Sequence, residues 1–375
     1  MLEIQIVGAK SGDCLIISYG DEDDPNRILI DGGPRGVYRR HLRPRLMEIK
    51  EQMGTDRPVS FELAMVSHVD EDHIKGLLEL TDEMIEKDGS SQDPAKIKRF
   101  WFNSFTDLTG GNEPASLNAT INAIVASSAA GGQSPFPILT ESDDRANHIL
   151  AGIPQGRQLR DNLIQLGLDD NRPFSGKLLL QGKSTTIRGM KLDIIGPDIT
   201  RLTSLQQEWN PSLNPTEIAE FADKSIANLS SIVVLAEFDG KTILLTGDAR
   251  GDHVMDWLKD AGLLDDGGTF HVDVLKIPHH GSDKNVEPVF FESVTADTYL
   301  YCGDGRHDNP EPTTLRMMRE ARDDSDYKVI FSNFIEMQHA SKQDDFEAEI
   351  KALVNAGVHV DTRDNDEHAV ILKLI

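Results

Sequence analysis

The stretch that decides the fold is Ser67-His-Val-Asp-Glu-Asp-His-Ile-Lys-Gly76, which directly follows the apolar run 61–66. It holds four side chains of metal-ligating type: His68, Asp70, Asp72 and His73. The apolar run is typical of a buried strand, so these side chains would leave the end of that strand together. Imidazole and carboxylate groups at this density indicate a site for Zn²⁺, Mn²⁺ or Fe. The alternative interpretation is a solvated turn that caps the next helix, which needs one aspartate and no histidine.

Ligand-type residues also follow three other predicted strands. These residues are Asp31, after the apolar run 28–30 of the predicted strand 27–33, Asp248 after 241–246, and the pair His279-His280 after 272–277. Taken singly, a strand followed by Gly-Asp can be an ordinary turn, and two histidines can be a packed pair. Because all of them follow strands of the same kind, we expect them to converge on the motif Ser67–Gly76.

Strands and helices alternate along most of the chain. Predicted strands are 2–7, 14–19, 27–33, 61–67, 177–180, 185–188, 190–197, 231–238, 241–246, 272–277, 298–301, 328–331 and 368–374. Predicted helices are 39–52, one beginning near 74, 117–128, 143–150, 202–227, 252–261, 313–322 and 343–355. Many strands are apolar enough to be covered on both faces, which predicts an α/β fold arranged as a layered sandwich.

The region Thr81–Gly176 has a weaker pattern than the rest. Gly, Ser, Ala, Asn and Asp dominate it. We expect a single domain over residues 1–375, with about 81–176 as an inserted, partly helical lobe that is also a possible docking region for a protein partner.

Composition limits the classes of function. The chain has 375 residues and a formal net charge of −25, so it repels nucleic acid and anionic membranes at long range. Two cysteines exclude a disulfide framework. The sequence has no apolar run long enough to cross a bilayer and no signal peptide pattern, so the expected location is cytoplasmic, without membrane contact.

These motifs resemble those of the metallo-β-lactamase-fold hydrolases, and most closely the soluble metallo domain of the ComEC/Rec2 competence proteins. The resembling segments are Val7–Ile17, Ile28–Gly33, Ser67–Gly76, Asn228–Ser231, Leu245–Asp248 and His279–Ser282. The resemblance covers most of the chain outside 81–176.

The resemblance implies a metallo-β-lactamase-like αββα four-layer sandwich with two divalent metal ions, Zn or Mn. Carried over to this sequence, it places His68 and Asp70 on one ion, Asp72 and His73 on the other, Asp248 between both, His280 (with His279 as second choice) as the remaining ligand, and Asp31 behind the ligands. Asp70 departs from the broader fold, which has histidine there. Asn228 and Ser231 replace a further histidine, and His307 precedes Asn309-Pro310 where the branch has His-Pro.

A metal-dependent hydrolase is therefore expected, with a phosphodiesterase or nuclease favoured. Asp72 or Asp248 would accept the proton of the attacking water, and Asn228, Ser231, Lys276 or His307 would donate hydrogen bonds to developing charge. Arginines between 35 and 45 form either a basic patch or an ordinary solvated helix face. The alternatives are hydrolysis of a small thioester, lactone or amide, and a metal-binding partner subunit without turnover.

Overall fold

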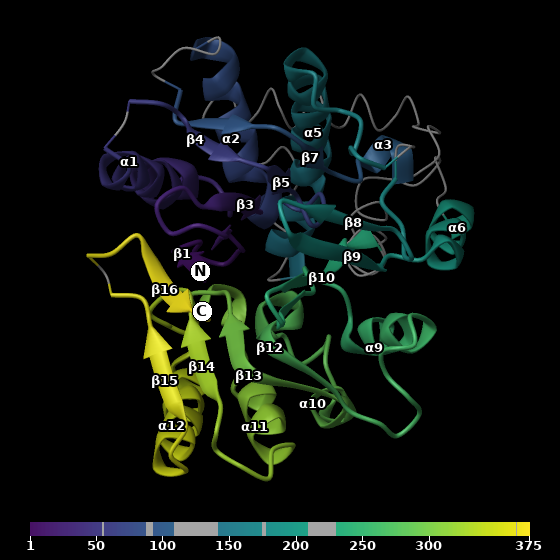
Figure 1. Cartoon of the computed structure of the whole chain (residues 1–375). Helices are drawn as coiled ribbons and strands as arrows, with labels where there is room; N and C mark the ends of the chain where they lie inside the picture. The colour runs from purple at the N-terminus through teal and green to yellow at the C-terminus, as the bar shows by residue number, and fades with distance from the viewer. Residues whose placement is uncertain (55, 88–92, 109–141, 175–177, 209–229, 365) are drawn as a thin grey trace.

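The computed structural model describes residues 1–375 except 55, 88–92, 109–141, 175–177, 209–229 and 365 (Figure 1). Two large sheets form its centre. One consists, in spatial order, of β16 (Ala369–Lys373), β1 (Leu2–Val7), β2 (Leu15–Tyr19), β3 (Asn26–Ile30), β5 (Leu63–Met65) and β7 (Phe100–Trp101). The other consists of β15 (His359–Thr362), β14 (Lys328–Phe331), β13 (Val294–Tyr301), β12 (Phe270–Lys276), β11 (Lys241–Leu245), β10 (Val233–Phe238), β9 (Met190–Gly196) and β8 (Ser184–Ile187). A small parallel pair joins β4 (Val59–Phe61) and β6 (Ala95–Ile97).

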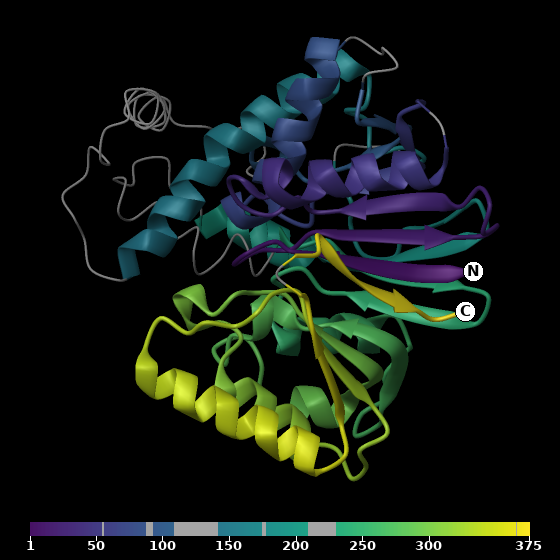
Figure 2. The ribbon, with the colours of Figure 1, turned by 90° about the vertical axis from the view of Figure 1, so that its left-hand side faces the viewer.

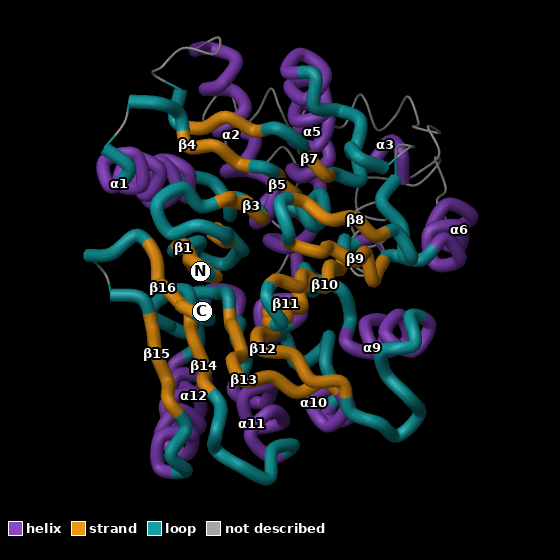
Figure 3. Tube along the Cα trace, viewed as in Figure 1, coloured by secondary structure: helices purple, strands orange, loops and turns teal. Residues whose placement is uncertain are grey.

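Helices cover the outer face of each large sheet (Figures 2 and 3). The six-stranded sheet packs against η1 (Tyr38–Leu42), α1 (Arg43–Gln52), α2 (Glu71–Lys87), α3 (Phe105–Leu108), α5 (Ser142–Leu166) and α6 (Ile199–Glu208), which share one hydrophobic cluster with it. The eight-stranded sheet packs against α9 (Gly251–Asp260), α10 (Pro288–Ser293), α11 (Pro312–Glu320) and α12 (Ala340–Asn355). The predicted αββα four-layer sandwich is confirmed.

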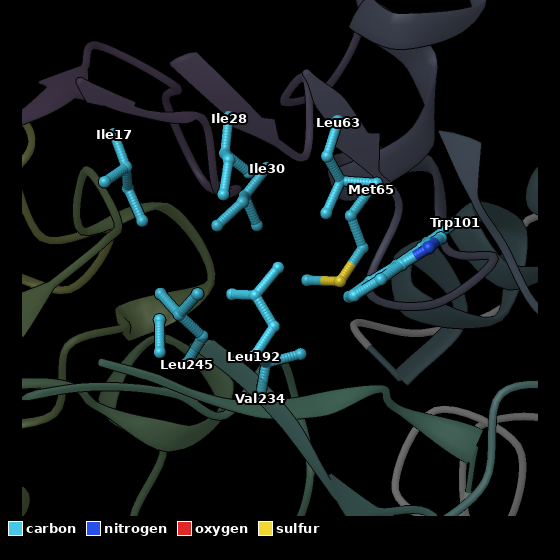
Figure 4. Close-up of a pocket in the computed structure, with 10 residues that line it drawn as sticks. Ile17, Ile28, Ile30, Leu63, Met65, Trp101, Leu192, Val234 and Leu245 are labelled. Atoms are coloured by element: carbon cyan, nitrogen blue, oxygen red, sulfur yellow. The ribbon is translucent and has the colours of Figure 1, made fainter. Parts of the chain in front are cut away.

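A third hydrophobic cluster lies between the two sheets. Period-two alternation builds it: Ile17 and Ile28 face the other sheet, whereas Ile16 faces the helices. Figure 4 shows Ile17, Ile28 and Ile30 opposite Leu192, Val234 and Leu245. The space left between these side chains is only 10 Å³, so the sheet interface has no room for a ligand.

Strand direction brings several loops to the same edges. Strands β11 to β15 run parallel, and so do β3, β5 and β7. Strand β1 runs in the same direction as β3, because both are antiparallel to β2. The segments after β1, β3 and β5 therefore leave the first sheet at the same edge. Those after β11 and β12 likewise leave the second sheet at one edge, as the sequence predicts.

The predicted strand 61–67 is divided at Glu62 into β4 and β5. The predicted strand 177–180 is wrong, and its first residue lies outside the described residues. Residues 178–180 form no strand, because the side-chain amide of Asn103 takes the place of a strand neighbour. Leu179 N–H donates to Asn103 Oδ1 at 2.7 Å, and Asn103 Nδ2 donates to the Leu179 carbonyl at 3.0 Å.

The lobe predicted at about 81–176 stays a prediction. Residues 109–141, including the predicted helix 117–128, lie outside the described residues, as does most of the predicted helix 202–227. The described part of 81–176 includes β7, which pairs with β5 of the large sheet. No described helix combines the length and the apolar character that a bilayer span requires.

Candidate metal centre

The motif Ser67–Gly76 bridges a strand and a helix. Strand β5 ends at Met65 and α2 begins at Glu71, so His68 and Asp70 lie on the connecting loop. Asp72 and His73 lie in the first turn of α2. The predicted placement at the carboxyl end of a strand is therefore confirmed.

Three glycines let the first turns of α2 approach the loops after β1 and β3. A Cβ on Gly76 would lie 1.9 Å from the Gly32 carbonyl oxygen, and a Cβ on Gly12 would lie 1.9 Å from the Asp72 carbonyl oxygen. These separations are far below any real contact, so only glycine fits. The backbone hydrogen bond from Gly32 N–H to the His73 carbonyl, 2.8 Å, locks the contact.

Asp248 is the centre of the cluster. Its Oδ2 lies 3.7 Å from His68 Nε2, 3.7 Å from His279 Nε2 and 3.4 Å from His280 Nε2, and its Oδ1 lies 3.3 Å from His73 Nε2. Donors about 2.1 Å from one ion lie roughly 3.0–3.4 Å from each other in octahedral or tetrahedral geometry. The separations around Asp248 are thus near those of ligands that share an ion, and most exceed those of hydrogen bonds.

The other donors fall on two sides of Asp248. On one side, His68 Nε2 lies 3.6 Å from Asp70 Oδ2, and His279 approaches the same Asp248 oxygen. On the other side, His280 Nε2 lies 3.2 Å from His73 Nε2 and 3.4 Å from Asp72 Oδ2. Both His279 and His280 therefore approach Asp248, and His280 is the one that faces Asp72 and His73.

The donor set fits divalent cations. Among the described residues, His68 Nε2 and Asp70 Oδ1 are buried and have no hydrogen-bond partner. A buried imidazole nitrogen without a partner is costly unless a ligand or ion satisfies it. The Nε2 atoms of His73 and His280 also face each other, an arrangement that suits two nitrogens directed at one ion.

Asp31 holds His73 directly and His68 through Ser67. Asp31 Oδ2 lies 2.9 Å from His73 Nδ1 and accepts the Ser67 hydroxyl at 2.8 Å, and Asp31 Oδ1 accepts the Ser67 N–H at 2.7 Å. Ser67 Oγ in turn lies 3.0 Å from His68 Nδ1. A carboxylate behind an imidazole fixes the ring and its tautomer, which is the orienting role expected for Asp31.

Sequence reasoning missed Asp13 and misjudged Lys276. The sequence predicts Lys276 as a donor to developing charge, but its side chain is 1% exposed and its Nζ lies 2.6 Å from Asp13 Oδ2. Asp13 Oδ1 lies 3.0 Å from His280 Nδ1, so the pair stands behind His280 as Asp31 stands behind His73. The signal for Asp13 was available, since it follows Gly12 in the loop after the first strand.

Burial and mutual charge shift several pKa values in this cluster. Burial alone would lower the pKa of His73, but the carboxylates of Asp248, Asp31 and Asp72 outweigh it and raise that pKa well above its ordinary value. Burial would raise the pKa of Asp248, but the surrounding histidines hold it well below its usual range. The Asp248 carboxylate is therefore ionised and available to a cation at neutral pH.

Three predicted residues remain to be placed. Asn228 lies outside the described residues. The Ser231 hydroxyl is fully buried and accepts the Asp248 N–H at 3.2 Å, so it positions Asp248. His307 is an exposed residue of the turn η4 (Arg306–Asp308). The cluster opens to solvent beside Asp72, whose side chain is 23% exposed while that of His73 is fully buried.

Comparison with known proteins gives low similarity. No protein-family model matches the chain, and no curated protein matches it in sequence. Solved structures that resemble it include YhfI of Bacillus subtilis, described as a metallo-β-lactamase-fold protein, with 8% identity, TM-score 0.39, and coverage of 99% of this chain and 98% of that one. A protein of Parabacteroides distasonis described as a metal-dependent hydrolase has 13% identity, TM-score 0.37, and coverage of 90% and 94%. CmlA of Streptomyces venezuelae, a diiron β-hydroxylase, has 11% identity, TM-score 0.39, and coverage of 100% and 54%.

These TM-scores are below 0.5, so the likenesses carry no conclusion about activity, metal or substrate. The relation to the ComEC/Rec2 branch stays a prediction.

Proposed function

We propose that the protein is a metal-dependent phosphodiesterase whose two divalent ions share the carboxylate of Asp248. The observation that supports this most is the position of the four histidine Nε2 atoms, 3.3–3.7 Å from the two Asp248 oxygens. Side chains from separate strand ends meet there, and water has access beside Asp72.

The charge of the cluster supports two divalent ions. Five carboxylates lie within 4.0 Å of a histidine or of Lys276 in this cluster. They belong to Asp13, Asp31, Asp70, Asp72 and Asp248. Histidines are neutral when they ligate a metal, so with the ammonium of Lys276 the five negative charges and one positive charge leave −4. Two divalent cations would balance this charge. An oxygen-rich set of this kind suits hard cations, which also accept anionic phosphate oxygens as ligands.

The chain's own residues have separable roles in this proposal. His68, Asp70, His279 and Asp248 would hold one ion, and Asp72, His73, His280 and Asp248 the other. When bound, the ions would supply Lewis acidity and activation of water. Asp72, the most exposed of the carboxylates, is placed to accept the proton of the attacking water. Asp31 and Asp13 keep His73 and His280 in orientation.

Hydrolysis of bis-p-nitrophenyl phosphate in the presence of Mn²⁺ or Zn²⁺ tests the proposal. Asp72→Asn keeps the shape of the side chain but replaces a charged ligand and proton acceptor by a neutral amide. It should therefore lower kcat at least about 100-fold. Asp361→Asn, on an exposed position of β15, is the matched control and should leave turnover unchanged.

The two alternative functions give different outcomes. Turnover of a lactone, thioester or amide without phosphodiester cleavage would replace the proposal with the small-substrate hydrolase. Stoichiometric metal without turnover on any of these substrates would favour a metal-binding partner subunit.

A further inference from the structure

Three loops surround the candidate metal centre and are tied to one another. The segment after β1 packs against the Asp72 carbonyl through Gly12. The segment after β13 is joined to the histidine pair, since the Glu311 N–H donates to the Gly281 carbonyl at 3.0 Å. The segment after β14 joins both, because Asn333 Nδ2 lies 3.0 Å from the Lys10 carbonyl and 3.0 Å from the Gly303 carbonyl. These loops therefore form one rim beside the centre.

The rim carries positive charge in a strongly acidic protein. Lys10 is partly exposed and donates from Nζ to the Arg35 carbonyl at 2.7 Å. Arg35 and Arg40 are exposed, and neither forms an ion pair within the described part of the chain. Burial, and after it the charges of Arg40 and Arg306, lower the pKa of Lys10, whereas the carboxylates of Asp304 and Glu71 act in the opposite direction.

Other arginines of the expected basic patch are already engaged. Arg43 pairs with Glu83 at 2.9 Å, Arg45 is buried and pairs with Glu48 at 2.7 Å, and Arg39 lies 4.0 Å from Glu79. The patch predicted from the sequence is therefore reduced to the cations that border the rim.

The same rim exposes an aromatic ring. Phe334 follows Asn333 and is 61% exposed, the largest exposed fraction among the large hydrophobic residues of the described chain. The loop of Phe334 is hydrogen-bonded to the loop of Arg306, since the Glu336 N–H donates to the Asp304 carbonyl at 3.0 Å. Phe334 thus lies on a loop that is hydrogen-bonded both to the loop of Lys10 and to the loop of Arg306. Proteins bind single-stranded nucleic acid with exposed rings, on which bases stack, together with cations that contact the phosphates.

We propose that Lys10, Arg306 and Phe334 form a binding subsite for a nucleotide adjacent to the scissile phosphodiester of a single-stranded nucleic acid. This inference rests on the proposed function, whose substrate class it narrows. Lys10 would contact a phosphate oxygen, Arg306 a second one, and Phe334 would stack on a base.

Acidic neighbours of Lys10 and Arg306 restrict where a single-stranded nucleic acid can bind. Arg306 Nε lies 3.5 Å from Asp304 Oδ2, and Glu71 raises the pKa of Lys10 against the effect of burial. The overall charge of −25 opposes any polyanion that makes no such local contacts. Binding should therefore be weak, confined to short single strands, and strongly dependent on these side chains.

Binding of a fluorescein-labelled twelve-nucleotide thymidylate to the metal-free protein in EDTA, followed by anisotropy at several salt concentrations, tests the subsite without turnover. Phe334→Ala should weaken binding about tenfold, and Phe334→Trp should restore it. Lys10→Gln should weaken binding and lower the slope of log affinity against log salt by about 0.7. Lys328→Gln, at the opposite end of β14, and Val354→Ala, an exposed apolar residue of α12, are matched controls and should change neither quantity.

Steady-state kinetics with metal separate this inference from the proposed function. Phe334→Ala should raise KM for the oligonucleotide and leave kcat/KM for bis-p-nitrophenyl phosphate unchanged, which would support the subsite. Oligonucleotide binding and KM that are unaffected in Lys10→Gln and Phe334→Ala would overturn the subsite even if phosphodiesters are cleaved. Equal binding of duplex and single strand, indifferent to Phe334, would also overturn it. Rim-dependent binding without phosphodiester cleavage would retain the subsite and refute the proposed function.

Discussion

Replacing Lys276 by methionine removes an ammonium group from a buried pair and keeps a side chain of similar length. The Nζ atom lies 2.6 Å from Asp13 Oδ2, 2.8 Å from the Gly247 carbonyl oxygen and 3.7 Å from Asp248 Oδ1. At an effective dielectric constant of about 20, two unit charges at this first distance attract by roughly 6 kcal/mol. The lysine no longer has to be desolvated in the variant, so the net loss is smaller, at about 3–5 kcal/mol. His280, 3.0 Å from Asp13, partly compensates, so we expect a value near 3 kcal/mol.

Urea unfolding of the metal-free protein at pH 7 measures this loss. The double variant Asp13→Asn/Lys276→Met removes both charges and should be at least about 1 kcal/mol more stable than Lys276→Met, because no buried carboxylate is left without its partner. A loss below about 1 kcal/mol for Lys276→Met, or a double variant no more stable than the single one, would refute the idea that the ammonium compensates Asp13.

Three further predictions follow from other contacts. Gly76→Ala should lower the free energy of unfolding by about 1–3 kcal/mol and abolish tight metal binding, because its Cβ meets the Gly32 carbonyl oxygen; calorimetry that finds wild-type metal affinity would contradict this. Asp198, which accepts Trp257 Nε1–H at 2.6 Å, has its pKa lowered to about 2, against burial, by hydrogen bonds from Arg201 and Trp257. It therefore stabilises the fold above pH 4 and loses this effect as the pH falls toward 2, so Asp198→Asn should cost about 1–2 kcal/mol at pH 6 and progressively less toward pH 3 in urea titrations; a cost independent of pH would exclude this linkage. His68→Gln should bind one equivalent of Mn²⁺ or Zn²⁺ tightly instead of two, as metal analysis after gel filtration would measure, and two retained equivalents would remove His68 from the donor set.

Most of the layered fold could be predicted from the sequence because apolar runs and their spacing determine which faces are buried. The strands predicted at 231–238 and 241–246 are adjacent in the structure, and the Asp-Gly turn between them predicted their antiparallel pairing. The prediction of a strand at 177–180 was wrong. The spacing of apolar residues carries no information about the Asn103 side chain, which takes the hydrogen bonds of Leu179 that a neighbouring strand would take. The helix expected near 143–150 extends over Ser142–Leu166 and contains Pro154, a residue that sequence reasoning takes as a helix boundary.

The candidate metal centre was predictable where several donors cluster in the sequence, and less so where one residue acts alone. The four donors within Ser67–Gly76 could be predicted because they lie so close together in the sequence. Asp13 and Lys276 could not, since a lone aspartate or lysine is most often a surface residue. Only the contact between the loop after β1 and the end of β12 reveals that both are buried. Whether His279 or His280 faces Asp72 depends on positive backbone φ angles of 47° and 54° in that turn, which no sequence pattern specifies.

The central claim is that two cations share Asp248. Anomalous diffraction from crystals of the Mn²⁺- or Zn²⁺-loaded protein tests it most directly. We predict two anomalous peaks about 3.5–4 Å apart, one bordered by His68 and Asp70 and the other by His73 and His280, with the Asp248 carboxylate between them. A single peak, or two peaks that do not both contact Asp248, would contradict the account.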